Sequence, residues 1–210
     1  MKRFALIVTI VFVQAALASG PGLCDLALNE MMGDPASDWD GDGVYDYRGD
    51  EWVEVINTGG STIDLSSYRL GDPLTLAYGF TGDLGPGDVL VVYGSESKEW
   101  ESDNGYSSFG FNMSNDGDTV ILYQISGGDT LIVDSHTFNT YEAEDDRSSG
   151  RYPDGDGGWE IFDFLNPYFG GTAPFGNGLE PTPGSLNTGL TPTPTRETTW
   201  GSIKSIYQLP

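Results

Sequence analysis

Short apolar runs separated by turn residues constrain the fold of this chain more than any other feature of its sequence. Residues 51–56, 89–93, 119–123 and 130–134 are rich in β-branched and aromatic side chains. Clusters of Gly, Asp, Asn and Pro lie between such runs, as at 57–60, 84–88, 115–118 and 127–129. Strands with tight turns give this pattern, whereas amphipathic helices do not. The sequence therefore predicts an all-β sandwich of about seven strands.

The same pattern of apolar runs and turns predicts the structure of individual segments. Residues 89–93 are apolar throughout, which is typical of a central strand buried on both faces. Residues 119–123 and 130–134 flank Gly127 and Gly128, and this arrangement predicts a hairpin. Residues 142–151 are polar and are expected to form an exposed loop, while residues 159–175 are expected to form an irregular covering segment.

The N-terminus has the features of a secretory signal peptide. Lys2 and Arg3 precede an apolar stretch at 4–13, and residues 16–18 form a small-x-small cleavage site. We predict a signal peptide over residues 1–18 and a leader over 19–25. The apolar stretch is shorter than the ~20 residues that a membrane span requires, and no later stretch predicts a span. Cys24, the only cysteine, follows Leu23 rather than the small residue of a lipoprotein signal, so we expect an exported protein without a lipid anchor or an intramolecular disulfide.

The C-terminus changes character after the predicted sandwich. Residues 189–199 alternate Thr and Pro and are expected to form an extended linker. In the tail at 200–210, Trp200, Ile203, Ile206 and Tyr207 have a helical spacing. The tail is therefore either a short amphipathic helix or a frayed end.

The charge balance is strongly acidic. Nine Lys and Arg residues face 32 Asp and Glu residues, which gives a formal net charge of −23. Nucleic acids are bound through clusters of Lys and Arg, so we expect no nucleic-acid partner. The carboxylates either keep the chain soluble by self-repulsion or hold divalent cations.

The candidate metal site is an acidic loop with carboxylates at alternate positions. Ca²⁺ takes six to eight oxygen ligands, and a D-x-D-x-D-G run can wrap three carboxylates around one ion. A calcium-binding EF-hand loop ends in a bidentate Glu, but Gly49 stands at that position, so the match is partial. The alternative is a solvated acidic turn. The predicted ligands are the carbonyl of Val44 and the carboxylates of Asp38, Asp40, Asp42, Asp46, Asp50 and Glu51.

The residues also bear on two other classes of function, a hydrolase and a carbohydrate-binding module. Ser135 precedes His136, the only histidine, and neighbouring strand residues point to opposite faces, so a Ser-His pair is not expected. A glycosidase-like carboxylate pair stays open as a small extracellular hydrolase. A carbohydrate-binding module would instead use aromatic side chains from loops. The candidates either stack on sugars or cover the ends of the sandwich, and they are Trp39, Tyr45, Tyr47 and Trp100.

The order of these segments resembles the lamin-tail domain. The clearest resemblance is residues 50–57, with Trp52, Glu54 and Asn57, and Tyr68 stands where the family often has Trp. Together the similar segments span a domain over residues 26–188: 28–32, 50–57, 63–70, 84–88, 114–120, 133–135, 150–155 and 182–187.

The resemblance implies an immunoglobulin-like β-sandwich with an irregular C-terminal extension and no catalytic motif. The family occurs in nuclear lamina proteins of animals and resembles a secreted or surface module in bacteria, and the signal peptide favours the second setting. We therefore expect an extracellular or cell-surface module that binds a protein or an envelope or glycan partner. Residues 199–207 resemble short tails of some exported bacterial proteins, which suggests a sorting or docking peptide.

Overall fold

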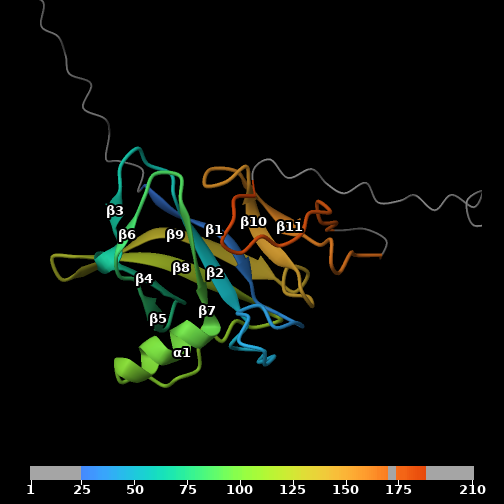
Figure 1. Ribbon diagram of the computed structural model, residues 1–210, viewed down its shortest axis with the longest axis horizontal. Helices are drawn as coiled ribbons and strands as arrows, with labels where there is room; N and C mark the ends of the chain where they lie inside the picture. Colours follow the sequence, from blue (N-terminus) through green and yellow to red (C-terminus); the bar gives the residue numbers. More distant parts are fainter. Residues whose placement is uncertain (1–24, 170–173, 188–210) are drawn as a thin grey trace, which may run out of the picture.

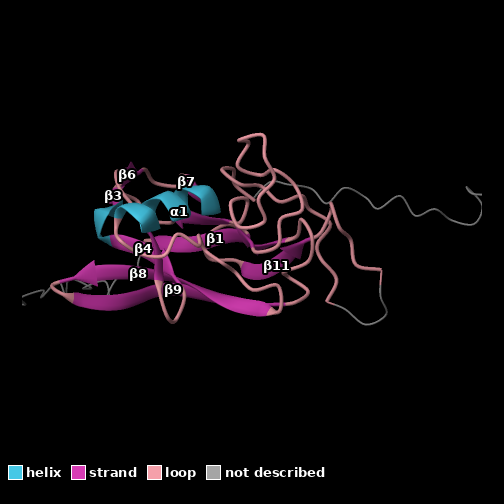
Figure 2. Ribbon diagram, turned by 90° about the horizontal axis from the view of Figure 1, so that it is seen from below, coloured by secondary structure: helices cyan, strands magenta, loops and turns pink. Residues whose placement is uncertain are grey.

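The chain folds into two β-sheets packed face to face (Figures 1 and 2). The computed structural model describes residues 25–169 and 174–187. The all-β, immunoglobulin-like sandwich is confirmed. The predicted signal peptide, Cys24, the linker at 189–199 and the tail at 200–210 lie outside the described residues.

The first sheet has five antiparallel strands in the order β11-β10-β1-β2-β7. Its strands are β1 (Leu26–Met32), β2 (Trp52–Asn57), β7 (Val89–Tyr93), β10 (Ser148–Tyr152) and β11 (Gly158–Phe162). Every residue of β2 is buried, because β2 lies between β1 and β7 and its faces are covered.

The second sheet has four antiparallel strands in the order β5-β4-β8-β9. These are β4 (Tyr68–Gly71), β5 (Leu76–Gly79), β8 (Gly117–Ser126) and β9 (Asp129–Asn139). The β8–β9 hairpin was predicted and is confirmed; Gly127 and Gly128 form its turn with φ of 61° and 94°, a region that favours glycine. The short strands β3 (Ile63–Asp64) and β6 (Asp83–Leu84) pair with each other, and the 3₁₀ turn η1 (Leu65–Ser67) follows β3.

The core lies between the two sheets. Leu28, Val53 and Val55 come from the first sheet, and Leu70 and Leu122 come from the second; all five belong to one buried cluster. The described residues form more strands than the seven expected, because β5 and the two-residue strand β6 were not predicted and two further strands, β10 and β11, come from segments predicted as a loop or as irregular.

The interpretation of residues 142–151 as an exposed loop was wrong for their C-terminal half. Ser148–Tyr152 is β10, which pairs with β1 on one side and β11 on the other. Its polar residues Ser148 and Ser149 are buried because their hydroxyls donate to Glu30 and Glu142. Likewise, Gly158–Phe162 is a regular strand at the start of the segment expected to be irregular.

Two further local differences concern the segment after β6. Strand β7 lies at the edge of its sheet and is mostly half-buried, so the prediction of a central strand was wrong; Val92 belongs to the core and Leu90 packs against it. Helix α1 (Gly94–Asp103) follows directly after β7. This helix was not predicted, because its sequence is polar and has only one large apolar side chain, Trp100. It is held by tertiary contacts instead, including a bond of 2.7 Å from Ser97 Oγ to the Ala77 carbonyl on β5.

Candidate functional site

Three of the predicted metal ligands converge in the acidic loop that joins β1 to β2. Oxygen atoms of Asp38, Asp40 and Asp42 all lie within 4.8 Å of one another. The three side chains are exposed or half-exposed. No other group of at least three potential metal-ligating residues gathers in this way in the part of the chain that the structure describes.

The local sequence explains this convergence. The Asp38 carboxylate accepts hydrogen bonds from the amides of Gly41 and Gly43, both at 2.9 Å. Asp40 and Asp42 each accept from the amide two residues ahead, at 3.0 and 2.7 Å. Gly41 and Gly43 have φ of 75° and 90°, which side-chain-bearing residues rarely adopt. Asp turns and glycines therefore curl the loop until the three carboxylates meet.

Two further carboxylates fix the base of the loop. Asp50, fully buried, accepts from the amides of Trp39 and Asp40 with Oδ1, at 2.6 and 3.1 Å, and from the Asp46 amide with Oδ2, at 2.7 Å. Asp146 accepts from the Ala36 amide and from the Trp39 indole, at 2.8 and 2.7 Å. The loop conformation is therefore held by the protein itself.

The other predicted ligands point elsewhere or have other partners. Asp46 forms an ion pair with Lys98, and the hydrogen bond from Lys98 lowers the pKa of Asp46. Glu51 is buried, and burial raises its pKa to about 9. Val44 is 65% exposed, and its amide donates to Asp42. Of the seven predicted residues, the structure brings Asp38, Asp40 and Asp42 together and gives Asp50 a structural role.

The spacing of the three carboxylates lets them supply some of the ligands of one calcium ion. Calcium binds oxygen at 2.3–2.6 Å, so two ligand oxygens on opposite sides of one ion lie about 5 Å apart. A separation of at most 4.8 Å therefore fits within one coordination sphere. Backbone carbonyls and water would complete the six to eight ligands that calcium prefers.

The four aromatic residues considered for sugar binding do not form one row. Trp39 packs against Trp52 with ring centroids 6.3 Å apart, and the Tyr45 hydroxyl donates to the Pro35 carbonyl. Tyr47 is 58% exposed, with the Arg48 guanidinium over its ring. Trp100 lies on α1 and stacks on Tyr106, with centroids 5.5 Å apart.

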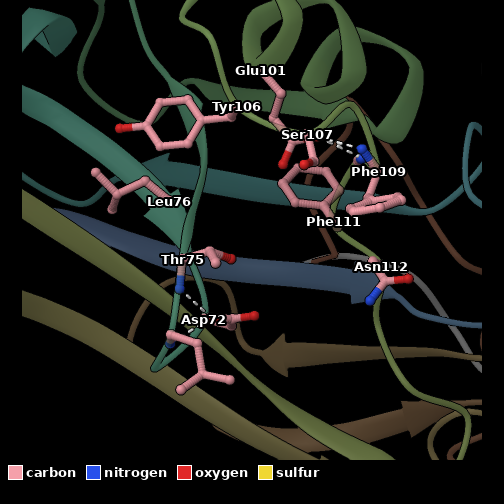
Figure 3. A pocket seen from close by; sticks show the side chains of 11 residues that line it. Asp72, Thr75, Leu76, Glu101, Tyr106, Ser107, Phe109, Phe111 and Asn112 are labelled. Atoms are coloured by element: carbon pink, nitrogen blue, oxygen red, sulfur yellow. Dashed lines mark hydrogen bonds between the residues drawn. The ribbon is translucent and has the colours of Figure 1, made fainter.

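A surface groove lies beside Trp100, between the β4–β5 turn and the segment after α1 (Figure 3). It has a volume of about 400 Å³. Figure 3 shows Tyr106 and Leu76 on one side and the rings of Phe109 and Phe111 on the other. The Glu101 carboxylate has a structural role, because its Oε2 accepts hydrogen bonds from the amides of Phe109 and Gly110 at 2.7 and 2.9 Å. Sequence reading missed this groove because its residues come from two separate loops.

The only histidine has a packing role. His136 Nε2 lies 2.8 Å from Glu142 Oε1, and its ring stacks on Trp159 with centroids 3.9 Å apart. Ser149 also donates to Glu142, at 2.8 Å. The carboxylate thus lies between the serine and the histidine, whereas a catalytic triad requires the histidine in the middle.

Sequence reading also missed a pair of buried glutamates, Glu30 on β1 and Glu54 on β2. Both are fully buried, and burial raises the pKa of Glu30 to about 8 and that of Glu54 to about 7. The available signal was a Glu within an apolar strand, since charged residues are rarely buried without partners.

The chain matches a known protein family. The model of the Lamin Tail Domain family matches residues 21–140. A search of the curated proteins found no match, and neither did a search of the solved structures. Across residues 25–169 and 174–187, no helix has the length and apolar character needed to cross a membrane. The family match spans more than half of the chain and agrees with the immunoglobulin-like sandwich, a generally non-catalytic fold for protein interaction, so the chain belongs to the lamin tail domain family.

Proposed function

We propose that this protein is an exported, non-enzymatic interaction module at the cell surface or outside the cell, whose acidic loop binds calcium as a structural ion. The observation that carries the proposal is the convergence of Asp38, Asp40 and Asp42 within 4.8 Å in a loop that Asp50 and Asp146 hold in place. The predicted signal peptide supports export.

The non-enzymatic part of the proposal is supported by where the perturbed carboxyl groups lie. Glu30, Glu51 and Glu54 are enclosed by protein and accept hydrogen bonds from it. A hydrolase needs such groups in a cleft that substrate can enter, and the groove of Figure 3 is lined by none of the three. The carboxyl groups that line it are Asp72 and Glu101; burial raises the pKa of Glu101, and both carboxylates accept hydrogen bonds from backbone amides.

Calcium would act on stability. Three carboxylates within 4.8 Å repel one another, and the salt bridges of Lys98 and Arg151 among the described residues go to Asp46 and Asp134 instead. A divalent ion would neutralise this repulsion and join the loop into one rigid unit. The loop and the nearby exposed rings of Tyr45 and Tyr47 would then form a defined surface for a partner.

Thermal melting of residues 19–210 with calcium and with excess chelator tests the proposal. At about 100 times the dissociation constant, a ligand stabilises by ~2.7 kcal/mol, which corresponds to several degrees in Tm for a domain of this size. The doubly substituted Asp40→Ala, Asp42→Ala protein should lose the calcium effect.

The matched control removes two exposed acids outside the loop, Asp103→Ala plus Asp129→Ala, and should keep the calcium effect. The same Tm with calcium and chelator in the unsubstituted protein would mean that the loop is a solvated turn.

Carbohydrate binding is the second candidate, and the groove favours it. Tyr106 and Phe109 are 48% and 55% exposed along its rim, and aromatic faces of this kind stack on sugar rings. Binding to a glycan array, lost in Tyr106→Ala plus Phe109→Ala and retained in Tyr47→Ala, would establish this function. An array without binding would leave the protein-interaction module.

A further inference from the structure

The last described segment of the chain, residues 182–187, is fastened to the first sheet through three carboxylates. We refer to these residues as the closing segment. The Thr182 amide donates to Glu30 Oε1 at 3.1 Å, and the Gly184 amide donates to Glu54 Oε2 at 2.7 Å. The Asn187 amide donates to Asp154 Oδ1 at 2.8 Å. The chain continues from this segment into residues 188–210.

Two acceptors, Glu30 and Asn187, compete for the single hydrogen of the Thr182 hydroxyl. Thr182 Oγ1 lies 2.7 Å from Glu30 Oε2 and is also hydrogen-bonded to Asn187 Oδ1. Asn187 Nδ2 donates to the Arg151 carbonyl at 3.1 Å, so the amide oxygen is the atom that faces Thr182. A hydroxyl has one hydrogen and cannot donate to two acceptors. If the hydroxyl donates to Asn187, Glu30 Oε2 must carry a proton and donate it to Thr182; an ionised Glu30 would instead accept from the hydroxyl and leave Asn187 Oδ1 without that hydrogen.

The neighbouring carboxylates show the opposite pattern. Glu54 accepts from the Asn29 side-chain amide at 2.8 Å and from the Gly184 amide. Asp154 accepts from Asn29 Nδ2 at 3.0 Å and from the Asn187 amide. These N–H groups can only donate, so neither contact requires a proton on the acceptor. A single proton on Glu30 satisfies the network.

The surroundings of Glu30 favour its neutral form. It is fully buried and makes its other contact with the Ser148 hydroxyl, at 2.6 Å. The acidic Glu54 on β2 raises its pKa further, and Asp154 after β10 acts in the same way on Glu54. Arg151 on β10 turns its guanidinium to Asp134 and to the Leu28 carbonyl. Burial raises the pKa of Glu30 to about 8, although the hydrogen bonds from Ser148 and Thr182 act in the opposite direction.

We propose that protonated Glu30 is a latch that holds the closing segment on the sheet and releases it when the proton is lost. Loss of the proton leaves Glu30 Oε2 and Asn187 Oδ1 facing one hydroxyl hydrogen, and it places a charge beside Glu54, whose own pKa burial raises to about 7. The segment then leaves the sheet, because its three amides and the Thr182 hydroxyl can bond to water instead. The latch thereby sets how firmly the closing segment is attached to the sandwich.

The sign of the pH dependence follows from linkage. A folded-state pKa of about 8, against 4.5 for the free group, means that the closed form binds the proton more tightly. The latch is therefore strongest below about pH 4.5 and weakens as pH rises to 8. Its closing constant falls by up to about tenfold for each unit in that window and levels off above it.

The test uses the chain without its predicted signal peptide, residues 19–210, between pH 5 and 9. NMR would follow the Glu30 carboxyl carbon and the exchange protection of the Thr182, Gly184 and Asn187 amides. The carboxyl should titrate well above 4.5, and the three protection factors should fall together by at least about tenfold. Amides in the centre of β8 should keep their protection. A folded-state titration of Glu30 near 4.5, or protection of the three amides that does not change with pH, would overturn the proposal.

Two glutamine variants separate the latch from a general loss of packing. In Glu30→Gln the side-chain amide replaces the protonated oxygen and donates to Thr182, so protection should stay high and lose its pH dependence. In the matched variant Glu54→Gln the new amide group faces N–H donors, so protection should fall at every pH. If Glu30→Gln instead loses protection at pH 5, Glu30 is ionised in the native state and the latch does not exist. The Glu30 carboxyl titration decides the question even if Glu54→Gln fails to fold.

Discussion

At the scale of single residues, acidic side chains close together in sequence have different roles. Asp40 and Asp50 are both aspartates of the β1–β2 loop, but Asp50 is fully buried and accepts three backbone amides, whereas Asp40 is half-exposed and accepts one. Hydrogen bonds to a charged group contribute about 1.5–3 kcal/mol, and their loss leaves buried donors unpaired. The first aspartate is a candidate ligand, and the second holds the backbone that presents it.

This difference predicts opposite responses to substitution. Asp50→Ala should lower the free energy of unfolding by about 2–4 kcal/mol even in chelator, because three amides lose their acceptor. Asp40→Ala should change it by less than about 0.5 kcal/mol in chelator, as surface substitutions do, and should act only when calcium is present. Urea unfolding in both conditions measures the two effects. Equal losses in chelator would show that both residues are structural.

At the scale of secondary-structure elements, the strands and turns that were predicted correctly are those whose own residues determine their structure. Strand β2 and the β8–β9 hairpin were predicted from their own residues, since β-branched runs and the Gly127-Gly128 turn are local signals. The Asp38–Asp40–Asp42 cluster was also found, because the loop curls through bonds between residues two to five positions apart.

The elements that were missed depend on distant partners. Strand β10 has a polar sequence, and it becomes a buried strand because β1, more than a hundred residues earlier, provides Glu30 for Ser148. Helix α1 begins after an edge strand and is held by Ala77 on β5. The latch joins residues 152 positions apart. No window of the sequence contains these pairs, so periodicity and turn signals cannot reveal them.

The position of β10 predicts that the family match does not define the folding unit. The match ends at residue 140, but β10 and β11 complete the sheet that contains β1 and β2, and Phe162 on β11 is fully buried. Removing them would expose the β1 edge, and unpaired apolar strand edges promote aggregation. A fragment of residues 19–140 should therefore show no cooperative melting and should aggregate, whereas residues 19–187 should melt cooperatively. Cooperative melting of the shorter fragment would show that β10 and β11 are additions to a complete domain.

At the scale of the whole molecule, charge is concentrated in the sandwich. All acidic residues except Glu197, and five of the nine basic residues, lie between positions 25 and 187. Among the described residues, two salt bridges between Lys or Arg and Asp offset this excess, Lys98–Asp46 and Arg151–Asp134. Self-repulsion of a net charge destabilises a compact state, so the free energy of unfolding contains a long-range unfavourable contribution that salt can screen.

This charge predicts that the protein becomes more stable as ionic strength rises. The Debye length falls from about 30 Å at 0.01 M salt to about 10 Å at 0.1 M, a distance shorter than the sandwich is wide. In chelator, the Tm should rise by a few degrees over this range, since about 1 kcal/mol shifts the Tm of such a domain by ~2–4 °C. A constant or falling Tm would mean that the local ion pairs outweigh the general repulsion. Adding Mg²⁺ and Ca²⁺ at equal ionic strength then separates screening from binding: screening acts equally for both, whereas a calcium site in the acidic loop gives an additional rise with Ca²⁺ that Asp40→Ala plus Asp42→Ala removes.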